Sequence, residues 1–153
     1  MLLIDRIEKV FGVGAPPPAP LVEPEYLRAA AHDEQGATEY FLGKSWKGLD
    51  ADLLRYHRAA MYMFTPPAHQ YYFPAFMRAA LDSPPEDDGI ADLIIYHLSQ
   101  YLDPFWWERI RLFNPPQCDV VAEFVELVSD DTHRDSGDTI RALAALERTR
   151  RGV

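Results

Sequence analysis

Apolar side chains recur every three or four residues along most of the chain, the spacing that places them on one face of an α-helix. The clearest example lies at residues 120–128, where four valines and one phenylalanine form a stripe and Asp119, Glu123 and Glu126 lie off it. No stretch shows the sustained alternation, bounded by hairpin turn residues, that marks a β-strand. The pattern therefore predicts an all-α fold, a single compact domain of about six to eight helices whose topology it leaves open.

Capping residues indicate where several of these helices begin. Asp50 precedes an apolar stripe that continues to Phe64, which predicts one helix over this stretch. Three further capping residues stand directly before a proline, which the first helical turn tolerates because its missing donor is not needed there: Thr65, Asp103 and Asn114. Gln117 follows the last of these at the spacing of a capping box, and Ser83 with Glu86 has the same spacing.

A glycine- and proline-rich stretch separates a short N-terminal stripe from the rest of the chain. Residues 2–11 place apolar side chains at helical spacing, and residues 12–20 (GVGAPPPAP) then favour an extended, semi-rigid path. We therefore expect two parts: an N-terminal helix with its proline-rich linker over residues 1–20, and a helical domain over residues 21–150.

Residues that interrupt or border a helix determine where we expect the helices of this domain to begin and end. One helix is expected to start near Glu23 and to run through residues 26–31. Pro74 cannot donate a helical hydrogen bond, so we expect a short helical turn before it and a separate, longer helix over residues 73–81. After the last helix, the tail that begins at Arg148 is expected to fray.

Composition limits the class of protein. A chain of 153 residues with 48% hydrophobic residues can build one core. The single cysteine, Cys118, excludes an internal disulfide and cysteine-rich zinc sites. Charged residues interrupt the apolar N-terminus, which excludes a secretory signal, and no apolar run approaches the ~18 residues of a membrane span. We therefore expect a cytoplasmic protein without a membrane partner.

The formal net charge of −9 is concentrated in one third of the chain. Residues 79–133 contain twelve acids and two bases, a formal charge of −10, whereas the remainder is nearly neutral. Such a field repels phosphate backbones, which argues against nucleic acid, and favours the approach of a basic protein. The alternative is that these acids only keep helix faces soluble. The interaction hypothesis rests on four acids and two tryptophans: Glu86, Asp87, Asp88, Asp92, Trp106 and Trp107.

The sequence contains no recognisable catalytic or metal-binding motif. Its five histidines lack the spacing of a zinc-binding helix, and no phosphate-binding loop or nucleophile elbow is present. We therefore expect no metal and no cofactor. Cys118 stands in the first turn of a helix, where the macrodipole lowers a thiol pKa, although an ordinary half-buried cysteine is the simpler interpretation.

Two function classes follow from these observations. The first is a cytoplasmic protein-interaction module with an acidic surface, an immunity- or antitoxin-like partner of a basic protein. The second is an enzyme or small-ligand binder whose site assembles around the Pro74 kink from four residues: His57, His69, Tyr71 and Tyr72. The absence of a catalytic motif favours the first class. The sequence leaves the oligomeric state open.

Three segments carry a family resemblance: GKSWKGLDADLLRYH, FTPPAHQYYFPAFMRAAL and FNPPQCDVVAEFVELV. They resemble an uncharacterised family of small helical bacterial proteins, a domain of unknown function. Members share a tryptophan ahead of a helix, a Thr-Pro…Tyr-Tyr-x-Pro-Ala block and a later Pro-x-Gln helix start. The resemblance implies a helical fold and no assigned activity, cofactor or catalytic residue. We interpret the residues that carry it as caps, a kink and core: Trp46, Thr65, Pro66, Tyr71, Tyr72, Pro74 and Ala75.

Overall fold

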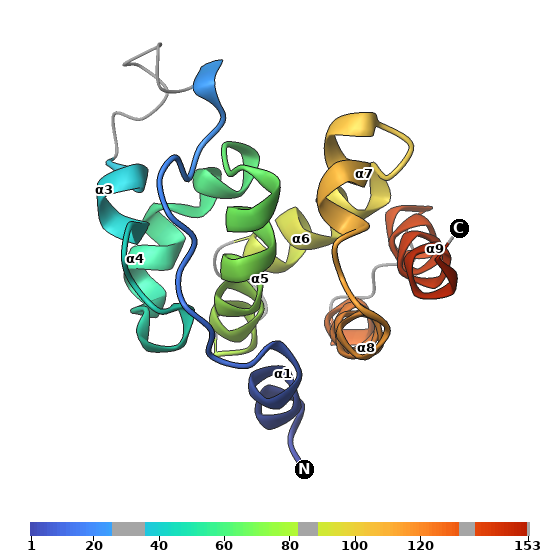
Figure 1. Cartoon of the computed structure of the whole chain (residues 1–153). Helices are drawn as coiled ribbons and strands as arrows, with labels where there is room; N and C mark the ends of the chain where they lie inside the picture. The colour runs from blue at the N-terminus through green and yellow to red at the C-terminus, as the bar shows by residue number, and fades with distance from the viewer. Residues whose placement is uncertain (26–35, 83–88, 132–136, 153) are drawn as a thin grey trace.

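The computed structural model describes residues 1–25, 36–82, 89–131 and 137–152, and within these ranges the chain is helical (Figure 1). Its α-helices are α1 (Leu3–Phe11), α3 (Ala37–Phe41), α4 (Ala51–Tyr56), α5 (Pro66–Leu81), α6 (Ile90–Ser99), α7 (Pro104–Ile110), α8 (Pro115–Asp131) and α9 (Gly137–Arg151). Two 3₁₀-helices, η2 (Trp46–Gly48) and η3 (Arg58–Tyr62), connect them. The expected single all-α domain of six to eight helices is confirmed.

Helix α5 is the centre of the fold. It packs against α1, α4, α6 and α7, while α9 lies against α6 and α8 (Figure 1). Because neighbours cover α5 on several sides, its buried residues are not confined to one stripe, and Tyr72, Phe73, Ala75 and Phe76 are all buried in succession around Pro74. The core therefore surrounds α5 rather than lying on one side of it.

The N-terminal part of the chain packs against the helices that follow. Ile7 of α1 is fully buried, and Arg6 pairs with Glu123 of α8 at 2.5 Å. After the extended residues 12–20, which run along α5 in Figure 1, Val22 forms an isolated antiparallel bridge with Phe64. The expected division of the chain at residue 20 stays a prediction.

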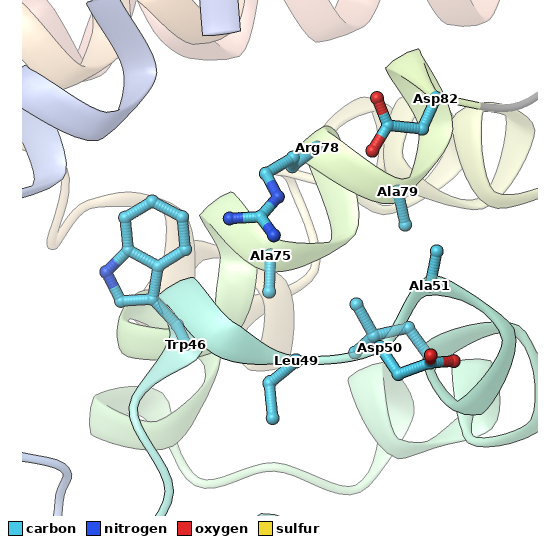
Figure 2. A pocket seen from close by; sticks show the side chains of 9 residues that line it. Trp46, Leu49, Asp50, Ala51, Ala75, Arg78, Ala79 and Asp82 are labelled. Atoms are coloured by element: carbon cyan, nitrogen blue, oxygen red, sulfur yellow. The ribbon is translucent and has the colours of Figure 1, made fainter. Parts of the chain in front are cut away.

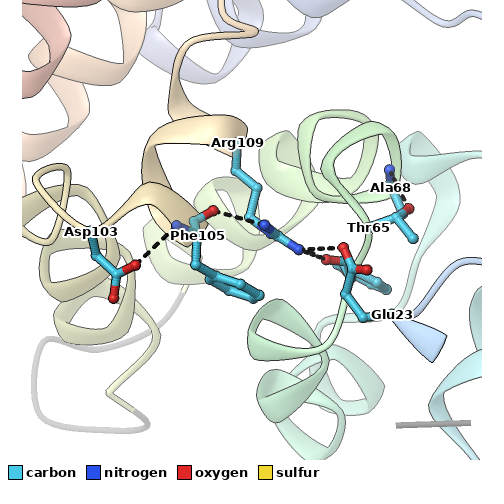
Figure 3. Close-up of polar contacts among 7 residues, drawn as sticks. Glu23, Thr65, Ala68, Asp103, Phe105 and Arg109 are labelled. Carbon is cyan, nitrogen blue, oxygen red and sulfur yellow. Dashed lines mark hydrogen bonds and ion pairs between the residues drawn. The ribbon is translucent and has the colours of Figure 1, made fainter. Parts of the chain in front are cut away.

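A buried arginine fastens this bridge to α7. Arg109 is fully buried, and its Nε and Nη2 atoms donate to the carbonyl oxygen of Phe64 at 3.2 and 2.8 Å (Figure 3). Nη1 donates to the carbonyl oxygen of Phe105 at 2.7 Å, and Nη2 also pairs with Glu23 at 2.7 Å. The guanidinium lies 3.6 Å above the Phe105 ring. One side chain thus connects α7 with both segments of the bridge.

The predicted caps are present. Asp50 Oδ1 accepts from the backbone N–H groups of the second and third residues of α4, at 2.8 and 3.1 Å. Asn114 and Gln117 form the reciprocal capping box, with both hydrogen bonds at 2.9 Å. Thr65 caps α5 and Asp103 caps α7 (Figure 3).

The structure corrects three expectations about helix ends. α5 continues through Pro74 without a break, because the fixed φ of proline is close to helical and packing on both sides holds the turn. The helix capped by Asp50 ends at Tyr56, and η3 follows, so its expected continuation to Phe64 was wrong. The tail expected to fray is helical through Arg151. The helix over residues 26–31 and the Ser83–Glu86 box lie outside the described residues.

Candidate functional site

A cleft of about 250 Å³ lies between the η2–α4 segment and the C-terminal half of α5 (Figure 2). Six of the nine residues that line it are apolar: Trp46, Leu49, Ala51, Leu54, Ala75 and Ala79. Three charged residues also line it: Asp50, Arg78 and Asp82. We call this cavity the acid-lined cleft. In Figure 2, Arg78 and Asp82 lie one turn apart on α5, with Asp50 on the opposite wall.

Local sequence explains why this space is open. On α5 the cleft residues Ala75, Arg78, Ala79 and Asp82 share one helix face at i, i+3, i+4 and i+7, and the two alanines are too small to fill it. The opposite wall begins at η2, where Trp46 is almost fully buried and its indole N–H donates to the Gly12 carbonyl at 2.7 Å. The indole therefore forms a rigid end wall.

The charged residues of the cleft differ in whether they have a partner of opposite charge. Arg78 Nη1 donates to the Lys47 carbonyl at 2.5 Å and lies 3.7 Å from a carboxylate oxygen of Glu8. Lys47 itself lies 3.4 Å from Glu8. The carboxylate of Asp82, by contrast, makes no ion pair or hydrogen bond with any other residue that the structure describes. The cleft's cation is thus already held from outside, and the carboxylates define its polar character.

A second groove, between α8 and α9, contains the single cysteine. Cys118 is buried at its floor, and burial, with the nearby carboxylate of Asp119, raises its thiol pKa to about 11. The pKa lowering expected from the helix macrodipole is therefore outweighed by loss of hydration. Asp119 at the rim pairs with Arg150 at 2.7 Å. This thiol stays protonated at neutral pH and behaves as an apolar wall.

Two histidines are buried side by side where α5, α6 and α7 meet. His69 and His97 have ring centroids 6.5 Å apart, and His97 stacks on Trp106 at 4.0 Å. None of their four ring nitrogens has a hydrogen-bond partner among the described residues. Burial and the Arg109 cation lower the pKa of His97 to about 3, and burial holds that of His69 well below 6.5. Both imidazoles are therefore neutral.

The residues of the interaction hypothesis occupy different environments. Trp106 is buried against His97, and Trp107 is half-buried with the Arg148 guanidinium 4.5 Å above its ring. Asp92 is exposed on α6. The remaining three acids, Glu86, Asp87 and Asp88, lie outside the described residues. The tryptophans therefore contribute packing, and Asp92 is the exposed residue among the described members of this set.

The four residues of the alternative site occupy different environments. His57 stacks on Tyr40 with ring centroids 4.7 Å apart, whereas His69 belongs to the buried pair. The Tyr72 hydroxyl is buried within hydrogen-bonding distance of two backbone carbonyls. The Tyr71 hydroxyl donates to the Gly14 carbonyl at 3.1 Å. Of the four, Tyr71 lines a cavity that opens to the surface.

The acid-lined cleft was not predicted from the sequence. Asp50 was interpreted only as a cap, Ala75, Arg78 and Ala79 as parts of the helix expected over residues 73–81, and Asp82 as one acid of the charged segment. Their spacing on one face, with two small alanines beside two charged residues, is a signal that could have marked a recess. No local pattern, however, indicates that η2 forms the opposite wall.

Two further classes of site are absent from the described part of the chain. Among these residues, no three histidine, cysteine, aspartate or glutamate side chains gather where they could hold a metal ion. None of the described helices combines the length and the apolar character needed to cross a membrane. Polar features of the described residues include the acid-lined cleft, the groove beside Cys118 and the cavity beside Tyr71.

Comparison with known proteins identifies the family and nothing finer. No curated protein matches the chain, and no solved structure matches it. One family model matches residues 23–148, which includes every wall of the acid-lined cleft but leaves out Glu8 and the rest of α1. Since the match covers most of the sequence, this chain belongs to the family described as "Family of unknown function (DUF6714)".

Proposed function

We propose that this chain is a protein-interaction module for a basic protein partner, and that a lysine or arginine side chain of the partner enters the acid-lined cleft. The observation that carries the proposal is the placement of Asp50 and Asp82 in one cleft whose own cation, Arg78, is held by Glu8 and a backbone carbonyl. A cation from outside therefore finds two carboxylates that make no ion pair with a described residue: Asp82, and Asp50, whose Oδ1 atom also caps α4.

The shape of the cleft suits a long basic side chain. Lysine and arginine combine an apolar stem with a charged end, and both bury the stem along apolar surface. Ala75, Ala79 and Leu54, each 2% exposed, form the floor along which the stem would lie, and Asp82 lies at the end of α5 where the stem would emerge. A fixed apolar floor with carboxylates at its edge supports a cationic occupant better than an anionic one.

The charge distribution supports the same partner class. The segment of charge −10 begins at residue 79, beside the cleft, and a field of one sign raises the association rate of an oppositely charged protein. On α8, two acids of this segment already have intramolecular partners, because Glu123 pairs with Arg6 and Asp119 with Arg150. The acid-lined cleft is therefore a better docking point than α8.

The biological setting follows as part of the proposal. A bacterial, cytoplasmic location fits the resemblance and a chain whose single cysteine cannot form an internal disulfide. An immunity- or antitoxin-like protein that neutralises a basic effector would use this kind of acidic docking surface. No step of such a role needs a metal, a cofactor or nucleic acid.

A defined basic peptide tests the proposal. A peptide of alternating lysine and alanine is titrated by calorimetry in about 20 mM and about 500 mM salt, where screening differs strongly. We expect saturable binding that weakens at least tenfold at high salt. Asp82→Asn should weaken low-salt binding about fivefold, and Asp50→Asn should act similarly, because asparagine keeps the cap and removes only the charge.

Glu108→Gln is the matched control, because it removes one exposed carboxylate of α7 outside the cleft. It should change affinity less than twofold. Equal losses for Asp82→Asn and Glu108→Gln would mean that the peptide senses only net charge. That result, or binding that ignores salt, would refute docking at the cleft.

A further inference from the structure

A second cleft, of about 310 Å³, lies between residues 11–17, the first turns of α5 and the start of α8. Three aromatic residues and two glutamines form much of its lining: Phe11, Trp46, Tyr71, Gln70 and Gln117. None of the described residues around it carries a charge. We call it the neutral cleft. Trp46 lies between this cavity and the acid-lined cleft, since it lines both.

Aromatic donors already hold an extended peptide along one side of the neutral cleft. The Trp46 indole N–H donates to the Gly12 carbonyl at 2.7 Å, and the Tyr71 hydroxyl donates to the Gly14 carbonyl at 3.1 Å. This is how aromatic grooves hold proline-rich backbones, with side-chain donors on carbonyls and rings beside the chain. The site therefore suits backbone-like amide groups next to rings.

The two glutamines have fixed orientations. Gln70 Nε2 donates to the Leu112 carbonyl at 2.9 Å, so its Oε1 atom is the acceptor left over. Gln117 Oε1 accepts from the Asn114 N–H at 2.9 Å in the capping box, so its Nε2 atom is the donor left over. Backbone partners thus determine which half of each amide remains for another group.

Neither remaining group is used inside the protein. Gln70 Oε1 and Gln117 Nε2 make no hydrogen bond within the described ranges, and Gln117 is only 8% exposed. Neither atom belongs to the buried unpaired side-chain atoms of the described residues, so each is open to water or to a ligand that enters the cleft. One acceptor, one donor and aromatic walls therefore meet in one uncharged cavity.

We propose that the neutral cleft binds an uncharged ligand that presents an amide edge beside an apolar ring. The ligand's N–H donates to Gln70 Oε1, its carbonyl accepts from Gln117 Nε2, and its ring packs on Tyr71 and Phe11. Proline-containing peptides and small cyclic lactams share this chemistry. Because no charge is involved, this site is independent of the docking proposed for the acid-lined cleft.

Two small probes test the proposal and distinguish the two sources. N-acetylproline N-methylamide represents a peptide and 2-pyridone a lactam ring; each is titrated into the isotope-labelled full chain by NMR. We expect saturable millimolar binding that shifts the Trp46 indole N–H and the side-chain amides of Gln70 and Gln117. The tighter probe identifies the source of the natural ligand. Raising the salt or introducing Asp82→Asn should leave both affinities unchanged.

Gln117→Glu removes the donor while keeping the oxygen that caps α8, because glutamate serves a capping box as well as glutamine. This substitution should lower the affinity for the tighter probe about five- to tenfold, as expected for one lost hydrogen bond. Gln100→Glu makes the same chemical change at the end of α6, outside the cleft, and should have no effect.

A second variant tests the acceptor of the cleft, so that the result does not depend on the folding of Gln117→Glu alone. Gln70→Lys keeps a donor for the Leu112 carbonyl and removes the acceptor, and it should weaken binding to a similar extent. Melting curves identify any variant that fails to fold. If neither probe saturates, or if Gln117→Glu and Gln70→Lys, correctly folded, bind like Gln100→Glu, the neutral cleft is not an amide site.

Discussion

The buried arginine of α7 and the buried histidines beside it are opposite solutions to the problem of a polar group in a core. Every guanidinium nitrogen of Arg109 donates a hydrogen bond, to Glu23 or to a carbonyl of Phe64 or Phe105. The four ring nitrogens of His69 and His97 have no partner among the described residues. We refer to these as the arginine centre and the histidine pair.

The difference shows what each group contributes to the fold. A satisfied cation is costly to remove, because its partners are left buried and unpaired. An unsatisfied neutral imidazole contributes only packing and adds a penalty for its lost hydration. The arginine centre should therefore carry stability at every pH, whereas the histidine pair should make stability depend on pH.

The largest expected effect comes from breaking the arginine centre. Arg109→Leu leaves Glu23 and the two carbonyls without their donor, so we expect a loss of about 3–5 kcal/mol in the free energy of unfolding. Urea denaturation at pH 7.5 measures it. Arg111→Leu, an exposed arginine just after α7, is the control and should change stability by less than about 0.5 kcal/mol. If Arg109→Leu lowered the free energy of unfolding by less than about 1 kcal/mol, the arginine centre would not stabilise the fold as proposed.

We expect the histidine pair to make the free energy of unfolding fall in acid. In the unfolded chain both histidines bind a proton near pH 6.5, whereas in the fold the pKa of His97 is about 3 and that of His69 is also far lower than 6.5. The unfolded state therefore binds more protons below pH 6.5, and stability falls as the pH falls. Two histidines give a slope of about 2.7 kcal/mol per pH unit.

This slope can be measured between pH 5.5 and 4.5 from urea midpoints. His97→Phe should halve the histidine contribution, to about 1.4 kcal/mol per unit, because one titrating group is gone. His57 is buried elsewhere, against Tyr40, so His57→Phe tests whether burial of any histidine has the same effect. If His97→Phe left the slope unchanged, the histidine pair would not be the source of acid sensitivity.

The two centres also differ in how far the sequence predicts them. Helix caps such as Asp50 and Asn114 depend on neighbours within three residues, and the sequence predicted them correctly. The partner of Arg109 at Glu23 lies 86 residues away, and no local pattern indicates it. Pro74 misled the prediction for a related reason, because its tolerance inside α5 depends on the packing of surrounding helices.

The two walls of the acid-lined cleft also differ in how far the sequence predicts them. The face of α5 that lines the acid-lined cleft follows from helical spacing alone, whereas its opposite wall follows from the position of Trp46, which tertiary contacts determine. The grouping of His57 with His69, Tyr71 and Tyr72 assumed that a kink at Pro74 opens a pocket. Without a break in α5, His69 packs against His97 and Trp106, whereas Tyr71 lines the neutral cleft.

A milder test replaces one imidazole by a ring without polar atoms. At pH 7.5, His97→Phe should raise the free energy of unfolding by about 1 kcal/mol, because it removes two unpaired buried nitrogens and keeps the aromatic contact with Trp106. The same substitution then improves stability at neutral pH and weakens its dependence on acid. Destabilisation at pH 7.5 would show that the imidazole nitrogens have a partner in solution.

The smallest expected effect comes from the cap of the helix that joins both centres. α7 carries Arg109 and the Trp106 ring, and Asp103 caps its start by accepting from the Phe105 N–H at 2.9 Å. Asp103→Ala should cost about 1 kcal/mol. If α7 opens as a unit, hydrogen exchange of its amides should quicken about fivefold, since 1.4 kcal/mol corresponds to a factor of ten.

Asp50→Ala is the matched control, because it removes the equivalent cap from α4, which carries neither centre. It should cost a similar amount and leave exchange in α7 unchanged apart from the global loss. Opening of α7 would expose the histidine pair to protons, so Asp103→Ala should also speed unfolding in acid more than Asp50→Ala does. Equal acid unfolding rates for the two variants would mean that the histidine pair is protonated only after global unfolding, and that α7 does not control access to it.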